Sequence, residues 1–141
     1  MDINQLIEFG SNHPLLVMAL FAILAMLAGG ELRARLSGVS EIGPGEATRM
    51  LNHDNAVMVD MRSDKEYREG HVINALHIPS QDNLASLDKY RDKPVIVYCN
   101  SGNQSNGYCS RLRKQGFSSV YNLRGGILGW QKAELPLSKS N

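Results

Sequence analysis

The stretch VYCNSGNQSNGYCSRL, residues 97–112, decides how the rest of the sequence is interpreted. A strand-like run at residues 95–98 ends at Cys99, and polar or glycine residues follow before a helical pattern begins. A loop that leads from a strand into a helix turns backbone N–H groups inward, and the helix start adds the positive end of its dipole. A thiol at the base of such a loop ionises readily. Cys99 is therefore a candidate nucleophile, and the alternative is an inert thiol at a strand end.

Short apolar runs alternate with helical patterns on both sides of this stretch. Ser63 with Glu66 three residues later forms a capping box, Ser105 is expected to cap the helix after the cysteine loop, and Gly116 is expected to end it. The sequence predicts strands at 39–42, 57–60, 75–78, 95–98 and 120–123, and helices at 45–51, 63–69, 81–87, 105–115 and 126–132. This alternation indicates an α/β fold, with a parallel sheet of about five strands and helices on both faces. Ligands bind at the carboxyl ends of strands in such sheets, which is where Cys99 lies.

The first thirty residues have a different composition. No charged residue occurs from Phe9 to Gly30, and residues 15–28 are wholly apolar. The uncharged span is close to the about 20 residues that a helix needs to cross a membrane. Pro14 suits the first turn of such a helix and Gly29-Gly30 suits its end. We therefore predict a short N-terminal segment at 1–13, a transmembrane helix at 14–30, a juxtamembrane linker at 31–38, a globular domain at 39–137 and a tail at 138–141.

The residues flanking the apolar span bear on its role and its orientation. A cleaved signal peptide would carry basic residues ahead of the span, whereas Asp2 and Glu8 lie there. A buried core helix is the other alternative, although the rest of the chain has a complete hydrophobic pattern of its own. Arg33 and Arg35 follow the span and no Lys or Arg precedes it. The positive-inside rule then predicts an outer N-terminus and a cytoplasmic domain, as in a bacterial inner membrane.

Charge and cysteine content exclude several classes of function. The chain has 141 residues, and its 15 basic and 14 acidic residues form no basic stripe or arm, so we expect no nucleic-acid partner. Its two cysteines, Cys99 and Cys109, lack the dense pattern of a disulfide scaffold and the histidine spacing of a zinc site. We expect a reduced compartment, no metal, and Cys109 as a small core residue.

Three segments resemble a single-domain rhodanese, and the resemblance covers about residues 39–137. The segments are VDMRSDKEYREGHVINALHIP from Val59, VIVYCNSGNQS from Val95 and VYNLRGGILGWQKAELPL from Val120. The resemblance implies the rhodanese fold and a sulfurtransferase that needs no cofactor. It implies that Cys99 takes a sulfane sulfur from a donor, becomes a persulfide, and passes the sulfur to a thiophilic acceptor.

The resemblance also assigns individual residues. Cys99 matches the sulfur-carrying cysteine, and Gly102 matches the glycine of the family's six-residue active loop. Asp60 and Arg62 match an Asp-x-Arg pair near the site, where we expect an ion pair or backbone hydrogen bonds that organise the loops. The persulfide would be held by the loop, which here consists of Asn100, Ser101, Gly102, Asn103, Gln104 and Ser105.

The cysteine loop departs from the usual pattern, Cys-Arg-x-Gly-x-Arg-Ser. Both arginine positions carry uncharged amides, Asn100 and Gln104. Losing a charge-assisted hydrogen bond of about 1.5–3 kcal/mol predicts weak use of the dianion thiosulfate, and a protein persulfide is the more credible donor. Ser105 stands where cysteine phosphatases on related folds have an arginine, which argues against phosphoryl transfer.

Two hypotheses about function follow. The first is a membrane-anchored sulfurtransferase that carries sulfur on Cys99, with a sulfur donor and a thiophilic acceptor as partners. The second is a catalytically weak or inactive rhodanese domain that is tethered to the bilayer and binds another membrane protein. The missing arginines favour the second hypothesis, whereas the retained Cys99, Gly102 and Ser105 favour the first.

Overall fold

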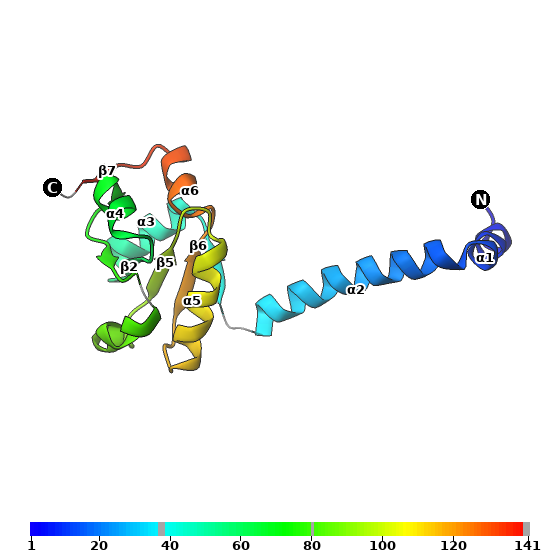
Figure 1. Ribbon diagram of the computed structural model, residues 1–141, viewed down its shortest axis with the longest axis horizontal. Helices are drawn as coiled ribbons and strands as arrows, with labels where there is room; N and C mark the ends of the chain where they lie inside the picture. The colour runs from blue at the N-terminus through cyan, green and yellow to red at the C-terminus, as the bar shows by residue number, and fades with distance from the viewer. Residues whose placement is uncertain (37–38, 80, 140–141) are drawn as a thin grey trace. The chain divides into compact units, whose positions relative to one another are not determined.

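The computed structural model describes residues 1–36, 39–79 and 81–139, in two compact units that divide after Leu36. The first unit contains two helices, α1 (Ile3–Asn12) and α2 (Pro14–Leu36) (Figure 1). Within α2, the stretch Pro14–Arg33 is long and apolar enough to cross a membrane, by length and composition alone. Helix α1 was not predicted; the Gln5 side chain accepts a hydrogen bond from the Asp2 N–H at its start.

Helix α2 ends later than expected. Gly29 and Gly30 lie inside the helix, which continues to Leu36, so the predicted end at residue 30 is wrong. Each glycine weakens a helix by about 1 kcal/mol, but the following residues, ELRARL, are strong helix formers that carry it onward. Most of the expected linker at 31–38 is therefore helical, and residues 37–38 lie outside the described residues.

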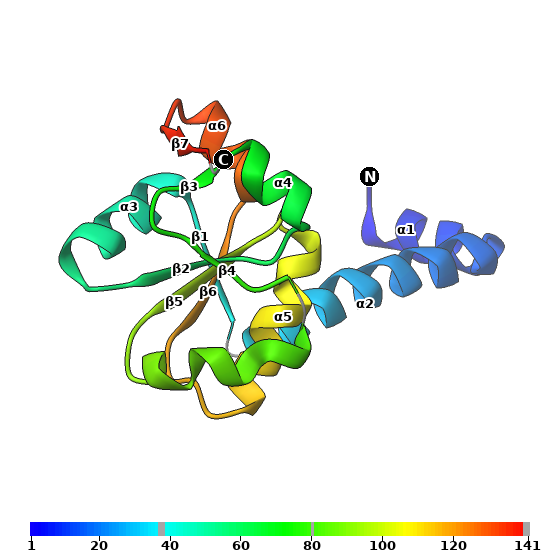
Figure 2. The ribbon, with the colours of Figure 1, turned by 60° about the vertical axis from the view of Figure 1, so that its left-hand side comes forward.

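The second unit contains the predicted parallel sheet (Figure 2). Its five strands lie in the order β1 (Ser40–Ile42), β6 (Val120–Leu123), β5 (Val95–Tyr98), β2 (Val57–Asp60) and β4 (Leu76–His77). A separate two-stranded antiparallel sheet pairs β3 (His71–Val72) with β7 (Leu137–Ser138), where we had expected the domain to pass into a tail. The central position of β5 places Cys99 in the middle of the sheet edge.

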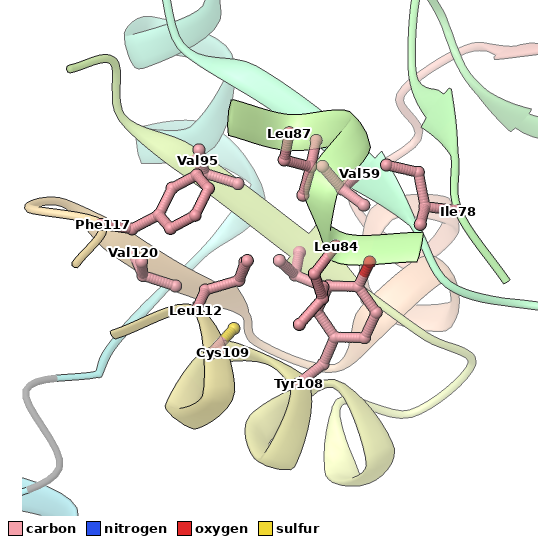
Figure 3. Close-up of a cluster of buried hydrophobic side chains, with 11 residues drawn as sticks. Val59, Ile78, Leu84, Leu87, Val95, Tyr108, Cys109, Leu112, Phe117 and Val120 are labelled. Carbon is pink, nitrogen blue, oxygen red and sulfur yellow. The ribbon is translucent and has the colours of Figure 1, made fainter. Parts of the chain in front are cut away.

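Helices cover both faces of the sheet, as predicted. On one face, α3 (Pro44–His53) and α6 (Gly126–Lys132) pack against Ile96 and Tyr98 of β5. On the other face, α5 (Asn103–Lys114) and the 3-10 segment η1 (Gln81–Tyr90) pack against Val95 and Val97. Figure 3 shows this second cluster, in which Leu84 of η1 lies beside Tyr108 of α5 and Leu87 lies beside Val59 of β2. All four residues of β5 are buried, because successive strand side chains point to opposite faces.

Several element ends differ from the expectations. The short helix α4 (Asp64–Glu69) begins with the predicted capping box of Ser63 and Glu66. Helix α5 begins at Asn103 rather than at residue 105, and Gly102 is its N-cap with φ of 94°. Ser105 is therefore not the cap that we expected but lies in the first turn, and this position directs its side chain to the site.

Candidate active site

Cys99 directly follows β5, at the carboxyl edge of the sheet. Asp60 pairs with Tyr98 in the register of β2 and β5, and Val97 pairs with Asn122 of β6. Cys99 thus follows the middle one of three strands whose carboxyl ends lie side by side. Cys99 itself is only 2% exposed.

Hydrogen-bonding groups surround the Cys99 sulfur. The Gly102 backbone N–H donates to Sγ over 3.1 Å, and the Ser105 hydroxyl lies 3.3 Å from it. Burial raises the pKa of the Cys99 thiol, but the Ser105 hydroxyl and the backbone N–H groups of Ser105, Gly102 and Ser101 lower it by more. The net pKa of Cys99 lies below the ordinary cysteine value, which favours the nucleophilic thiolate.

Ser105 links the thiol to a second buried side chain. Its hydroxyl donates to Oδ1 of Asn122 over 2.5 Å, and Nδ2 of Asn122 donates to the Gly102 carbonyl over 2.9 Å. The Ser105 hydroxyl has one proton, so while it donates that proton to Oδ1 of Asn122, the neutral Cys99 thiol is the donor to the Ser105 oxygen. When Cys99 loses its proton, the Ser105 hydroxyl can turn and donate to the thiolate instead. The serine thus responds to the ionisation of the cysteine.

The start of α6 holds the backbone of the cysteine loop. The Ile127 N–H donates to the Cys99 carbonyl over 2.9 Å, and the Leu128 N–H donates to the Asn100 carbonyl over 3.2 Å. This close approach requires Gly126, because a Cβ atom there would lie 2.3 Å from the Cys99 oxygen. The Gly-Gly pair after β6 therefore fixes the loop from the neighbouring strand end.

Asp60 and Arg62 form the expected ion pair. Nη2 of Arg62 lies 2.8 Å from Oδ2 of Asp60 and also donates to the Gly70 carbonyl over 2.6 Å. The Tyr98 hydroxyl donates to the same carboxylate over 2.6 Å. The Arg62 side chain is only 7% exposed, so its charge is used to hold the loop after β2.

Four residues of the cysteine loop lie toward solvent. Ser101, Asn103 and Gln104 are exposed, and so is Asn100, whose Nδ2 donates to Oε1 of Glu66 over 2.6 Å. This bond, followed by bonds from Ser63, lowers the pKa of Glu66. The family's first arginine position is thus occupied by an amide that binds a carboxylate.

Two hollows flank the cysteine loop. The acidic hollow, about 270 Å³, has Arg62, Glu66, Glu69, Asn100, Leu128 and Gln131 in its wall. The basic hollow, about 470 Å³, includes Ser101, Arg124, Leu128 and Lys132. A larger cavity of about 530 Å³, near Leu51, Met58 and Trp130, has neither a cysteine nor a residue of the loop among its described lining residues. Asn100 and Ser101, the two residues that follow Cys99, line the acidic and the basic hollow respectively.

Two histidines near the site have structural partners. Nδ1 of His71 lies 2.8 Å from the Tyr67 carbonyl, and Nε2 of His77 lies 2.7 Å from the Arg62 carbonyl. Both rings stack on Tyr67, with centroid distances of 3.8 and 4.4 Å. Both histidines thus make hydrogen bonds and ring contacts that hold the segments around Tyr67 together.

Cys109 is buried in the core, as expected. Its Sγ lies 3.4 Å from the Tyr121 carbonyl, and both cysteines are free. Burial, followed by the negative charge of Cys99, raises the pKa of Cys109 to about 12. Cys109 is therefore protonated at neutral pH and is a poor nucleophile.

Sequence reasoning missed two residues of the site, Asn122 and Tyr98. Both are polar groups in buried strands, and their partners lie far away along the chain. A signal existed for Asn122, since an amide within the strand VYNL needs a buried partner.

The fold and this cysteine loop define a class of protein. The family model for the Rhodanese-like domain matches residues 43–133, and the chain belongs to this family. It is 36% identical over 138 residues to "Uncharacterized protein YibN" of Escherichia coli K12, which covers 95% of this chain and 96% of that protein. It is also 36% identical over 99 residues to "Thiosulfate sulfurtransferase GlpE" of Glaesserella parasuis, covering 70% of this chain and 92% of that protein.

Solved structures agree with this fold. The crystal structure of a rhodanese-related protein from Thermoplasma volcanium matches with a TM-score of 0.61 and 24% identity, over 72% of this chain and 99% of that one. The predicted rhodanese fold is confirmed.

Proposed function

We propose that this protein is a membrane-anchored sulfurtransferase that carries sulfane sulfur as a persulfide on Cys99. The observation that carries the proposal is the surroundings of Sγ, with the Gly102 N–H at 3.1 Å and the Ser105 hydroxyl at 3.3 Å. These donors stabilise the thiolate before the reaction and can stabilise the terminal sulfur of a perthiolate after it. Membership of the rhodanese-like family, which includes relatives named thiosulfate sulfurtransferase, supports the same chemistry.

The reaction has two displacement steps. The Cys99 thiolate attacks the sulfane sulfur of a donor, the donor's S–S bond breaks, and the leaving group departs with the electron pair; from thiosulfate this group is sulfite. An acceptor thiolate then attacks the terminal sulfur of the perthiolate. The new S–S bond to Cys99 breaks, so Cys99 returns as a thiolate and the acceptor becomes a persulfide. No external oxidant or reductant is consumed.

Intact mass spectrometry tests the proposal and its main alternative. The full-length chain in detergent is incubated with thiosulfate or with a cysteine desulfurase and its substrate, beside Cys99→Ser. We expect the wild-type chain to gain the mass of one sulfur atom, which dithiothreitol removes. A larger fraction of the chain should gain this mass from the enzymatic persulfide source than from thiosulfate, and Cys99→Ser should gain none. If folded protein gains no sulfur from either source, the sulfurtransferase proposal is rejected, and the alternative of a membrane-tethered interaction domain remains.

The anchor is proposed to be α2. The stretch Pro14–Arg33 has the length and composition of a membrane span, and Arg33 and Arg35 at its end favour a cytoplasmic domain. A bacterial inner membrane fits this orientation and the two free cysteines. The donor, the acceptor and any membrane-protein partner are then expected on the cytoplasmic side.

A further inference from the structure

The wall of the acidic hollow has an unbalanced negative charge. Arg62 is its one cation among the described lining residues, and Asp60 neutralises it at 2.8 Å. Two carboxylates, Glu66 and Glu69, then remain in the wall. Asn100 binds Glu66 over 2.6 Å but brings no charge to offset it.

Glu66 is fixed in place rather than free to swing away. Its Oε2 accepts from the Ser63 N–H over 3.0 Å and from the Ser63 hydroxyl over 2.9 Å, while Oε1 accepts from Asn100. These bonds also lower the pKa of Glu66, so it is ionised at neutral pH. The carboxylate of Glu66 is thus held in a fixed position, where it accepts a hydrogen bond from Asn100, the residue that follows Cys99.

The basic hollow does not cancel this charge. Arg124 is paired with Glu41, with Nε 3.1 Å from Oε1, so among the described residues of that wall only Lys132 adds an unpaired charge. Leu128, which is 51% exposed, lines both hollows and separates them. A molecule that approaches beside Asn100 therefore meets negative charge.

We propose that Glu66, together with Glu69, selects the sulfur substrates of Cys99 by charge, favouring thiols and persulfides that bear an ammonium group over anionic ones. The inference rests on the proposed function, because it names the substrate class of the same site. A wall of one charge sign changes the local concentration and association rate of charged ligands by about tenfold or more. Asn100 permits this selection, since an arginine at that position would pair with Glu66 and remove the excess charge.

The test uses alkyl methanethiosulfonates, which modify thiolates without any sulfur-carrier activity. The Cys99 thiolate attacks the reagent's alkylthio sulfur, the S–S bond breaks, and methanesulfinate leaves with the electron pair. The full-length chain in phosphatidylcholine nanodiscs is treated with trimethylammonioethyl, sulfonatoethyl or methyl reagent, and peptide mass spectrometry follows Cys99. We expect the cationic reagent to exceed the anionic one by about tenfold after normalising each to its reaction with a free thiol.

Substitutions of single glutamates distinguish the effect of the charges of Glu66 and Glu69 from the effect of a disturbed cysteine loop. Glu66→Gln keeps a side chain that can complete the capping box, and it should lower the cation-to-anion rate ratio several-fold, as should Glu69→Gln. Glu46→Gln, on α3 and outside the hollow, should leave the ratio unchanged. The neutral reagent controls for loop damage, because a disturbed loop changes all three rates together. A wild-type ratio near one, or an unchanged ratio in Glu66→Gln, would overturn the inference.

Acceptor thiols extend the test to sulfur transfer. Persulfidated protein is mixed with cysteamine or with 3-mercaptopropionate, and each variant's rate is divided by the wild-type rate so that the thiol's own reactivity cancels. Glu66→Gln should slow transfer to cysteamine and speed transfer to 3-mercaptopropionate. If Cys99 accepts sulfur but shows no preference in either experiment, the inference fails and the proposed function stands. If Cys99 accepts no sulfur but the reagent ratio persists, the function fails and the charge selection stands.

Discussion

At the scale of single residues, Cys99 has a lowered pKa although its loop carries no positive charge. The donors are a hydroxyl and backbone N–H groups, and together they outweigh the effect of burial. The local geometry of Gly102, with φ of 94°, brings its N–H to 3.1 Å from the sulfur. Neutral hydrogen-bond donors in fixed positions thus lower the pKa of Cys99 without the two arginines that the family pattern would place in the loop.

Replacing Ser105 with alanine should raise the pKa of Cys99. A hydrogen bond of about 1 kcal/mol corresponds to roughly 0.7 pH unit, so the inflection should move upward by about half to one unit. The rate of alkylation by iodoacetamide rises with pH as the thiolate forms, and its midpoint reports this pKa. Ser110→Ala, on the same helix with its hydroxyl on the Asn106 carbonyl, is the matched control and should leave the midpoint in place. A midpoint unmoved in Ser105→Ala would contradict the account.

Replacing Asn100 with arginine should improve the use of thiosulfate. The guanidinium would neutralise Glu66 and offer charge-assisted hydrogen bonds to the dianion, which corresponds to about a tenfold gain in the rate of sulfur loading. Time-resolved intact mass measurement gives this rate directly. Gln104→Arg, at the second arginine position of the family pattern, tests whether any added charge suffices. A gain confined to Gln104→Arg would show that Glu66 does not set the preference.

At the scale of elements, the cysteine loop depends on the contact with α6. Gly126 has φ of 57°, and an added Cβ would meet the Cys99 and Asn100 backbone. We expect Gly126→Ala to destabilise the domain by about 1–3 kcal/mol and to slow the alkylation of Cys99. Urea unfolding of the full chain in detergent, followed by the fluorescence of the buried Trp130, measures the stability.

Gly107 offers the matched control for this substitution. It lies within α5, and an added Cβ would meet nothing within 4 Å. Gly107→Ala should therefore stabilise the domain by about 0.5–1 kcal/mol through its higher helix propensity. If both variants lose stability equally, the special role of Gly126 at the loop is wrong.

The elements also show what sequence reasoning could and could not provide. The mainly apolar runs of β2, β5 and β6 were enough to predict these central strands, since each is short and bounded by polar or turn residues. The position of Ser105 was misjudged because the left-handed conformation of Gly102 starts α5 earlier than the polar loop suggested. Strand β7 was missed because a two-residue pairing with β3 leaves no periodic pattern. Contacts such as Ser105 with Asn122 arise only from the register of the folded sheet.

At the scale of the whole molecule, α2 is expected to keep the rhodanese domain at a membrane. Removing residues 1–36 should move the protein from the alkali-resistant membrane fraction to the soluble fraction, because the apolar span supplies the free energy of insertion. Fractionation followed by immunoblotting measures this. Recovery of the full-length chain in the soluble fraction would contradict the anchor.

Orientation is tested separately in inverted inner-membrane vesicles. Protease added from outside should digest the domain in such vesicles and leave it intact in spheroplasts, because Arg33 and Arg35 favour the cytoplasmic side. The opposite pattern of protection would reverse the proposed topology.

The most direct measurement of the central claim locates the sulfur on the chain. Full-length protein in nanodiscs is exposed to a cysteine desulfurase and its substrate, trapped by alkylation, digested, and analysed by peptide mass spectrometry before and after addition of an acceptor thiol. We predict one extra sulfur on the peptide containing Cys99, its loss to the acceptor, and an unmodified Cys109, whose pKa of about 12 keeps it protonated. Sulfur found on Cys109 instead, or sulfur on Cys99 that no acceptor removes, would contradict the assignment of Cys99 as the carrier.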